Sequence, residues 1–540
     1  MIGNLTLWLA GRLRREAVAA QTAAHLTTLV REPVRAARRK ASALLAQLQR
    51  EPGPKVQLGV TAWGEAVIVP LRFLVEACSV VTGGMGSGKS LFASIIIEAL
   101  IRCMPELDTL SFGVIDAKGE LFDRALYLLG RRLEELQDPA REALLRRIVV
   151  IDFSARDVIS SYNVLVRFPH AEEDFFITSR LETLKELLPA GERLSLRGTS
   201  VLKPALALLS EFNLSVTYIG RLLSDDAFRH TLVAKTRNSE IRAFFEHHLK
   251  AESKQTLAAL RVRMETLVAS EGVRLALSGH TAPDFCRLQN EGAIVLINCA
   301  GPAITRGVRM LLQGLVLSDV RGAVFARPTE PPVKYLWVAD EAQNFFHSAQ
   351  QVEDVSDLLS MGRSFGSFFS LICQNLTTAV SDSRTLESIF TNIRWAMTFR
   401  GTPQDARFLR PALPVTGRRR RPDQHPFREP SLYSMEEERS LLQDSVGSLP
   451  DFGGYLWFKS RINEAIRITT QLPSIPRGRE FEAAVSRLRT MPELGGRMSR
   501  AEYERRIEER DRAWQEQPDE GGFQERLERA YREEQRRWQT

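Results

Sequence analysis

Eight residues, Gly83 to Ser90, constrain the fold of this chain more than any other part of its sequence. They run Gly-Gly-Met-Gly-Ser-Gly-Lys-Ser and match the pattern G-x-x-x-x-G-K-[ST] of a phosphate-binding loop. The apolar run Ala77–Val81 comes before them, and the apolar run Leu91–Ile101 follows. A glycine-rich loop between a buried strand and a helix can wrap backbone N–H groups around a phosphate at the positive end of the helix. The motif therefore predicts an α/β fold with a nucleotide site at this junction.

The residue types in this loop indicate what each part would do. The glycines let the backbone approach the phosphates, Lys89 can reach the β- and γ-phosphates, and the Ser90 hydroxyl can bind Mg²⁺. ATP and Mg²⁺ are therefore the predicted cofactors. The residues predicted to bind the nucleotide are Gly83, Gly84, Met85, Gly86, Ser87, Gly88, Lys89, Ser90 and Leu91. The alternative is a glycine-rich turn without function, which the flanking strand and helix disfavour.

A phosphate loop needs acidic groups that hold the metal and activate water, and one segment supplies them. The apolar strand predicted at Tyr335–Asp340 ends in two adjacent carboxylates, Asp340 and Glu341. Asp340 is expected to hold Mg²⁺, directly or through water, so the predicted metal ligands are Ser90 and Asp340. Glu341 is expected to orient and deprotonate the attacking water. The pair favours a hydrolase that turns over repeatedly over a kinase that transfers phosphate to an organic acceptor.

Gln374 and Arg363 complete the predicted catalytic set. Gln374 ends the next apolar strand, Ser367–Gln374, where an amide can lie beside the γ-phosphate and report its hydrolysis to the surrounding structure. Arg363 lies in a Gly-Arg-Ser-Phe-Gly turn, from which a guanidinium could reach the γ-phosphate of a neighbouring subunit. The alternative for Arg363 is a surface arginine that caps a helix. The predicted catalytic residues are Lys89, Glu341, Arg363 and Gln374.

The rest of the chain also fits an α/β fold. Further buried strands are predicted at Ser111–Asp116, Ile148–Asp152 and Ala293–Asn298, and a hairpin at Val56–Val60 and Ala66–Pro70. Apolar strands that are separated by helices are typical of a parallel sheet covered on both faces. Between Pro169 and Gly279 no strand pattern appears and the leucine spacing indicates helices, so we expect an inserted all-helical domain there.

Changes in composition divide the chain of 540 residues into five predicted parts. They are a basic helical N-terminal arm (1–55), the first part of a nucleotide-binding domain (56–168), an all-α domain (169–282), the second part of the nucleotide-binding domain (283–473) and a charged helical C-terminal extension (474–540). Residues 1–50 carry nine basic and two acidic residues, a difference of +7 that equals the net charge of the whole chain. A uniformly basic coat for nucleic acid is therefore excluded. The arm is either a helix that packs on the body or one that docks to a membrane or partner.

Two other charged segments are open to more than one interpretation. Residues Gly417 to Pro422 include four consecutive arginines and form either a phosphate-contacting loop or a solvated one. From Arg477 to Arg537 the chain has fifteen basic and fifteen acidic residues, so this segment is neutral and a poor candidate for binding nucleic acid. An exposed helix at Tyr503–Trp514 is predicted there, stabilised by i,i+4 ion pairs. It is a docking or oligomer-stabilising helix, or a plain solvated extension.

These motifs, in this order, resemble the coupling ATPases of type IV secretion and bacterial conjugation, the TraG/TraD-like members of the FtsK–HerA class of DNA pumps. The matching segments are the phosphate loop, Val114–Asp123 (with Ala117 in place of a family proline), Ile151–Leu165, Glu291–Pro302, the strand before Asp340 and Glu341, the Gly362–Gln374 segment, Asn392 and Phe399–Ala406. They span roughly Val56 to Pro473, which is most of the chain.

The resemblance implies a RecA-like motor domain that works as a homo-hexameric ring with ATP between subunits. The family's lysine and Mg²⁺ serine map onto Lys89 and Ser90, its acidic pair onto Asp340 and Glu341, and its interfacial arginine and sensing glutamine onto Arg363 and Gln374. The all-α domain would lie at the cytoplasmic mouth of the ring and meet DNA, a relaxase or protein substrates. A central channel would contact DNA phosphates without reading sequence.

The implied function is ATP-driven transfer of DNA, or of a relaxase–DNA or protein substrate, into a type IV secretion channel. Family members commonly carry an N-terminal transmembrane region, and no run here approaches the roughly 18 apolar residues that a span needs. The expected location is the cytoplasm, with three possibilities open: a separate membrane anchor protein, attachment of the arm to the inner face of the membrane, or work outside a secretion machine. One alternative function is a HerA-like soluble DNA translocase in repair, segregation or defence. Another is a docking hub that sorts effector proteins without passing DNA.

Overall fold

The computed structural model describes residues 38–168, 172–185, 196–249, 252, 254–374, 376–380, 382–415 and 432–515. Three predicted features therefore lie outside the described residues: the arm up to residue 37, the four-arginine loop at 417–422 and the extension beyond residue 515. The described end of the arm, residues 38–50, is helical, and its Leu45 and Leu48 side chains are fully buried. This end of the arm therefore packs on the body of the protein.

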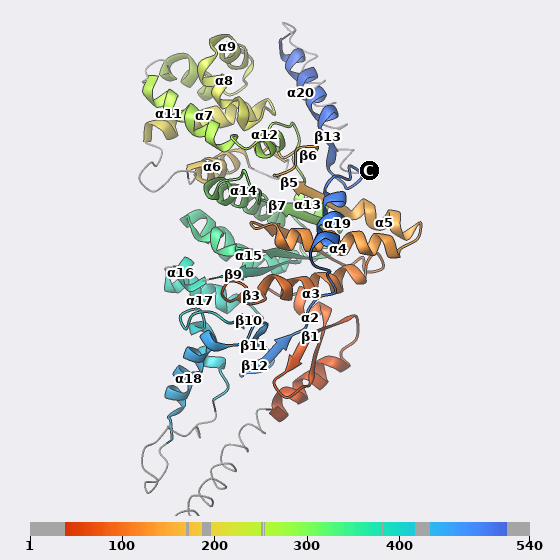
Figure 1. The fold of residues 1–540 in the computed structure, drawn as a ribbon. Coiled ribbons are helices and arrows are strands. Elements are labelled where there is room, and N and C mark those ends of the chain that lie inside the picture. The colour runs from red at the N-terminus through yellow and green to blue at the C-terminus, as the bar shows by residue number, and fades with distance from the viewer. Residues whose placement is uncertain are drawn as a thin grey trace, which may run out of the picture.

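A mixed sheet of eleven strands forms the centre of the described molecule (Figure 1). From one edge to the other, the strands are β2 (Ala66–Pro70), β1 (Lys55–Thr61), β12 (Ile466–Thr470), β11 (Gly453–Phe458), β10 (Trp395–Phe399), β3 (Ser79–Thr82), β9 (Ser367–Cys373), β8 (Lys334–Ala339), β4 (Leu110–Asp116), β7 (Ile294–Asn298) and β5 (Ile148–Asp152). The strands from β10 to β5 pair in parallel throughout. The predicted α/β fold with a parallel sheet is therefore confirmed for this part of the sheet.

The direction of each connection decides which face of the sheet a helix covers. The chain moves toward the β5 edge through α3 (Lys89–Arg102), α4 (Glu120–Glu135) and α5 (Ala140–Arg147). It moves back through α14 (Arg306–Phe325), α15 (Ala349–Met361) and α17 (Ser383–Asn392). Crossovers between parallel strands are right-handed, so opposite directions put these two sets of helices on opposite faces. Four further helices also accompany the sheet: α2 (Leu71–Val75), α13 (Phe285–Asn290), α16 (Leu376–Ala379) and α18 (Met435–Asp444).

The other edge of the sheet is antiparallel, and the sequence predicts only part of it. The predicted hairpin is confirmed as β1 and β2. The sequence pattern does not predict β10, β11 or β12. In the structure, β11 lies between the other two and pairs with both. The segment Gly453–Phe458 begins with two glycines, and Ile466–Thr470 alternates buried and exposed residues over only five positions. Such short segments become strands because a neighbouring strand is available to pair with them. The local sequence contains no signal for that neighbour.

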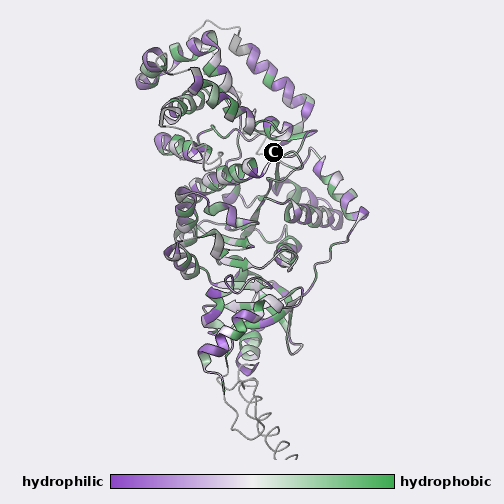
Figure 2. Ribbon diagram, turned by 60° about the vertical axis from the view of Figure 1, so that its left-hand side comes forward, coloured by the Kyte–Doolittle hydropathy of each residue, from purple (hydrophilic) through white to green (hydrophobic). Residues whose placement is uncertain are grey.

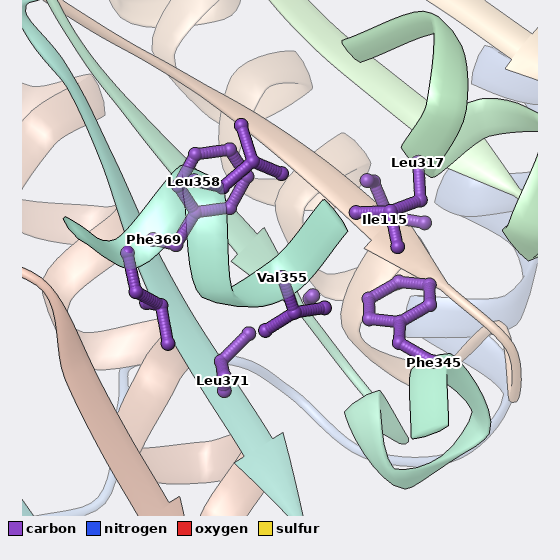
Figure 3. Close-up of a pocket in the computed structure, with 9 residues that line it drawn as sticks. Ile115, Leu317, Phe345, Val355, Leu358, Phe369 and Leu371 are labelled. Carbon is purple, nitrogen blue, oxygen red and sulfur yellow. The ribbon is translucent and has the colours of Figure 1, made fainter. Parts of the chain in front are cut away.

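A small apolar cavity marks where α14 and α15 pack on the sheet beneath β8 (Figure 3). Its volume is about 10 Å³, and Ile115, Leu317, Phe345, Leu358 and Phe369 are among the side chains that point into it. A space of this size holds at most about one water molecule, and an apolar lining gives that water no hydrogen-bond partner. The strand that leads to Asp340 therefore rests on a dry and closely packed base.

All of the regular elements that the structure describes between residues 172 and 277 are helices, as the leucine spacing predicts. They are α6 (Glu173–Lys185), α7 (Leu196–Glu211), a 3₁₀ turn (Val216–Tyr218), α8 (Ile219–Ser224), α9 (Asp226–Lys235), α10 (Ser239–Ala243), a π-helical turn (Phe244–His248), α11 (Lys254–Leu267) and α12 (Glu271–Leu277). We call this set the helical region. It lies beyond the β5 side of the sheet in Figure 1, and its treatment as a separate domain stays a prediction.

The last described segment, residues 479–515, returns along the molecule and joins the sheet to the helical region. We call it the C-terminal clasp; it comprises α19 (Arg479–Arg489), β13 (Arg497–Ser499) and α20 (Arg500–Gln515). β13 pairs with the short strand β6 (Val158–Ser160). The helix predicted within residues 503–514 is confirmed, but a solvated extension is wrong for this segment because Tyr503 is buried and donates a 2.6 Å hydrogen bond to the carbonyl of Leu275.

The hydropathy of the residues changes with their place in the fold (Figure 2). Hydrophobic residues lie along the strands and the inner faces of the helices, while α20 is hydrophilic over most of its length. In the described part of the chain, none of the helices is both long and apolar enough to cross a membrane.

Candidate active site

The predicted phosphate loop lies between β3 and α3, at the carboxyl edge of the parallel strands. Gly88 precedes the helix with φ of 111°, a conformation that side-chain-bearing residues rarely adopt. At Gly83 (φ 152°) an added Cβ would lie 2.7 Å from the Ser87 hydroxyl, so a larger residue would fill the space inside the loop. These glycines therefore keep an open cradle of backbone groups at the start of α3, which suits a bound phosphate.

Lys89 is buried and turns back over this cradle. Its ammonium donates hydrogen bonds of 2.7 Å to the carbonyl of Gly83 and 2.9 Å to the carbonyl of Gly84. Burial is the largest cause that lowers the pKa of Lys89, Lys118 lowers it further, and the carboxylates of Glu341 and Asp340 oppose the change. Both acceptors belong to the loop itself, so the ammonium can exchange them for the oxygens of a phosphate.

The predicted metal ligands meet at this edge although they lie far apart in the sequence. The Ser90 hydroxyl donates a 3.2 Å hydrogen bond to Asp340, and the Asp340 carboxyl is almost fully buried. Burial first, and the nearby charges of Asp116 and Glu341 next, raise the pKa of Asp340 to about 7. A divalent cation bound between Ser90 and Asp340 would relieve this cost. Because both donors are oxygens, the pair fits Mg²⁺, which binds one or two protein oxygens and keeps several waters.

Glu341 follows directly, in a backbone conformation that stores strain. Its φ is 53°, in the left-handed region that residues with side chains seldom adopt. The backbone N–H of Glu341 donates a 2.9 Å hydrogen bond to the Asp340 carboxylate. The strained residue therefore aims the two adjacent carboxylates in different directions: Asp340 faces Ser90, while Glu341 faces the end of the neighbouring strands.

The Glu341 carboxylate is held by three side chains. Gln374 donates to its two oxygens at 2.9 and 3.2 Å, and the Gln343 amide and Lys118 ammonium also contact it. Gln374 comes just after β9, and β9 lies between the phosphate-loop strand β3 and the acidic strand β8. This strand order brings together Lys89, Ser90, Asp340, Glu341 and Gln374, as the sequence predicts for one site.

Lys118 is a site residue that the sequence prediction missed. It follows β4 in the turn Asp116–Gly119, where the buried Asp116 carboxylate accepts hydrogen bonds from the N–H groups of Lys118 (2.7 Å) and Phe122 (2.9 Å). This turn aims the Lys118 ammonium at Glu341. The segment Val114–Asp123, on which the family resemblance rests, contains this turn, but the local sequence alone indicates no role for its lysine.

Arg363 does not join this site. It lies in a 3₁₀ turn (Gly362–Phe365) before β9 begins, whereas Gln374 lies after β9 ends. A strand of this length separates them by roughly 23 Å at about 3.3 Å per residue. Arg363 is exposed at the edge of the sheet opposite the phosphate loop, where its charge influences Cys78 and Arg394. A role in catalysis would therefore require a second subunit.

No protein-family model matches this chain, and neither does any curated protein. Among solved structures, it is similar to the plasmid coupling protein TrwB in complex with ADP and Mg²⁺, with a TM-score of 0.49 and 15% identity over 81% of this chain and 94% of that chain. It is also similar to VirB4 of Thermoanaerobacter pseudethanolicus, with a TM-score of 0.49 and 14% identity over 78% of this chain and 98% of that chain.

Proposed function

We propose that this chain is an Mg²⁺-dependent ATPase that drives DNA, or a relaxase–DNA or protein substrate, toward a type IV secretion or conjugation channel. The observation that carries the ATPase part is the meeting of Lys89, Ser90, Asp340, Glu341 and Gln374 at one edge of the sheet. The transfer part rests on the ordered motifs that resemble the coupling ATPases.

The residues divide the work of hydrolysis between them. The phosphate loop and Lys89 hold the phosphates, and Ser90 and Asp340 hold the metal, which neutralises phosphate charge and polarises the γ-phosphate when bound. Glu341 takes the proton of the attacking water. The Glu341 carboxylate is paired with Lys118 and Gln374, so it accepts a water molecule by exchanging one of these partners. Gln374, which touches both Glu341 and the end of β9, can transmit the change along the sheet.

The remaining features belong to the transfer part of the proposal. In a homo-hexameric ring, the exposed Arg363 of one subunit would reach the phosphate loop of the next and stabilise charge in the transition state. The helical region would receive DNA, a relaxase or another secreted substrate, in line with the family resemblance. The basic arm would attach the ring to a membrane anchor protein or to the inner face of the membrane.

Measuring ATP hydrolysis by the full chain, with and without single- and double-stranded DNA, tests both parts. Glu341→Gln should bind ATP but hydrolyse it at least 10²-fold more slowly, since general-base catalysis contributes about 10²- to 10⁴-fold. Glu353→Gln, which changes an exposed glutamate on α15, is the matched control and should keep full activity. Normal turnover by Glu341→Gln would refute Glu341 as the base that takes the proton of water, and absence of Mg²⁺-dependent hydrolysis by the wild-type chain would refute the ATPase assignment. If DNA of neither kind stimulates hydrolysis by the wild-type chain, the transfer of DNA is wrong and the effector-docking alternative gains support.

A further inference from the structure

A separate cavity of about 450 Å³ opens beside the hydrolytic centre. Its lining comes from the segments that follow four neighbouring strands, β9, β8, β4 and β7. Gln374, Glu341 and Lys118 supply one side, and Arg306 and Arg309 of the first turns of α14 supply another. None of the residues of the phosphate loop, all of which are described, lines it. Glu341 therefore borders both this cavity and the proposed hydrolytic centre.

The charges around the cavity are unbalanced. It is lined by three cations, Lys118, Arg306 and Arg309, against one carboxylate, Glu341. Lys118 already pairs with that carboxylate. Arg306 is exposed and makes no ion pair with a described residue, and the Nε of Arg309 is buried with no hydrogen-bond partner in the described part of the chain. Two guanidinium groups thus lack an anionic partner within the part of the chain that the structure describes.

A buried guanidinium nitrogen without a partner is costly, and an anion beside the Arg309 guanidinium would offset part of this cost by attracting its charge. The planar N–H groups of arginine match the oxygens of a phosphate, and two arginines provide enough donors for several of these oxygens at once. His347 also lines the cavity, and burial first and Arg306 next lower its pKa, so it adds a neutral polar group. An apolar ligand would leave all of these groups unpaired.

We propose that this cavity is a second phosphate site, which holds the inorganic phosphate produced by ATP hydrolysis before the phosphate leaves the protein. The inference rests on the proposed ATPase function. Attack by water forms a new P–O bond and breaks the bond between the γ-phosphorus and the oxygen that bridges it to the β-phosphorus. The electron pair of that bond stays on ADP, and the water proton passes to Glu341. The product is then formed next to Glu341, on the border of the cavity.

Direct binding of inorganic phosphate tests the site without any need for hydrolysis. The probe is radiolabelled inorganic phosphate in equilibrium dialysis against the nucleotide-free full chain carrying Lys89→Ala, which disables the phosphate loop. We expect one phosphate per chain to remain bound. Adding Arg306→Gln and Arg309→Gln should weaken this binding at least tenfold. Arg141→Gln is the matched control, since Arg141 is an exposed arginine on α5 that makes no ion pair with a described residue, and it should change nothing.

Retention of phosphate by the variant that lacks both arginines, or absence of binding in the Lys89→Ala chain, would overturn the proposal. Displacement of the labelled phosphate by a short single-stranded oligonucleotide would assign the cavity to the DNA backbone and would also overturn it. Melting temperatures within a few degrees of each other show that all variants fold. A wild-type chain that hydrolyses ATP but gives no phosphate site refutes only this inference, whereas a chain that binds phosphate through Arg306 and Arg309 but hydrolyses no ATP refutes the proposed function.

Discussion

The phosphate-loop edge of the sheet and the C-terminal clasp are both built from charged residues, but they use charge in opposite ways. At the edge, burial raises the pKa of Asp340, and the pKa of Lys89 is lowered, so the folded protein bears a cost there. In the clasp, Arg489 bridges two carboxylates, with hydrogen bonds of 2.6 Å to Asp123 and 3.0 Å to Asp152. Burial lowers the pKa of Arg489, but the two carboxylates together outweigh burial, so the pKa is raised. For these residues, charge is left costly where a ligand is expected, whereas at Arg489 the carboxylate partners outweigh the cost of burial. Arg497, also in the clasp, still has its pKa lowered to about 10 by burial.

The largest expected effect comes from Asp340→Asn. Removal of the carboxylate charge that we propose binds Mg²⁺ should lower Mg²⁺-dependent ATP hydrolysis at least 10²-fold. The melting temperature of the nucleotide-free protein should stay the same or rise, because a neutral amide is easier to bury than a carboxylate. Steady-state hydrolysis and thermal unfolding measure the two effects. A melting temperature several degrees lower would contradict the view that this residue costs stability.

The clasp should respond in the opposite way. Arg489→Ala leaves the buried Asp152 carboxylate without its guanidinium partner, so it should lower the free energy of unfolding by about 2–3 kcal/mol. Arg487→Ala is the control on the same helix, because its ion pair with Glu134 is exposed and should contribute less than about 1 kcal/mol. Denaturant unfolding measures both. Equal effects of the two substitutions would show that the clasp is not held by the buried charge.

Lys118→Gln tests the residue that only the structure revealed at the phosphate-loop edge. Loss of the ion pair should leave Glu341 less well oriented and lower kcat about tenfold, a change of about 1.4 kcal/mol in the barrier. The KM for ATP should change little, since Lys118 contacts Glu341 and not the phosphate loop. A kcat that rises instead would mean that Lys118 restrains the base rather than positions it.

The smallest expected effect is that of Tyr503→Phe, which removes one hydrogen bond from the clasp. The Tyr503 hydroxyl donates to the carbonyl of Leu275, so the free energy of unfolding should fall by about 1 kcal/mol. ATP hydrolysis should not change. If hydrolysis falls while stability is kept, the clasp takes part in the ATPase cycle, and the two regions are not separate in function.

Most of the candidate site could be predicted from the sequence because its residues occupy ends of buried strands. The strand before Asp340 and the strand before Gln374 are mostly apolar, and the ends of parallel strands meet at one edge. Lys118 was missed because its role depends on β4 lying next to β8, which is a matter of sheet order. Arg363 is predicted as catalytic, but the structure separates it from the site by the length of β9, so its role stays a prediction about a second subunit.

The central strands of the antiparallel edge and the contacts of the clasp could not be predicted from the sequence, for a different reason. β11 and β12 are short, and their strand conformation depends on pairing with β10 and β1. Within the clasp, Gly495 hydrogen-bonds with the outer strand β5, through its N–H to Ile148 at 2.9 Å and through its carbonyl to Val150 at 3.3 Å. An exposed sheet edge needs such a cover, but nothing local identifies the segment that provides it.

By itself, the amino-acid sequence determined the proposed chemistry of this protein: the predicted phosphate loop, acidic pair and glutamine follow from residue type and from the periodicity of neighbouring residues. Tertiary structure alone decided how distant segments meet. It aims Lys118 at Glu341, opens a cationic cavity beside Glu341 and ties residues 479–515 to both the sheet and the helical region. The reason is physical, because motif chemistry depends on neighbours along the chain, whereas long-range pairing depends on which surfaces remain uncovered once the strands have been ordered.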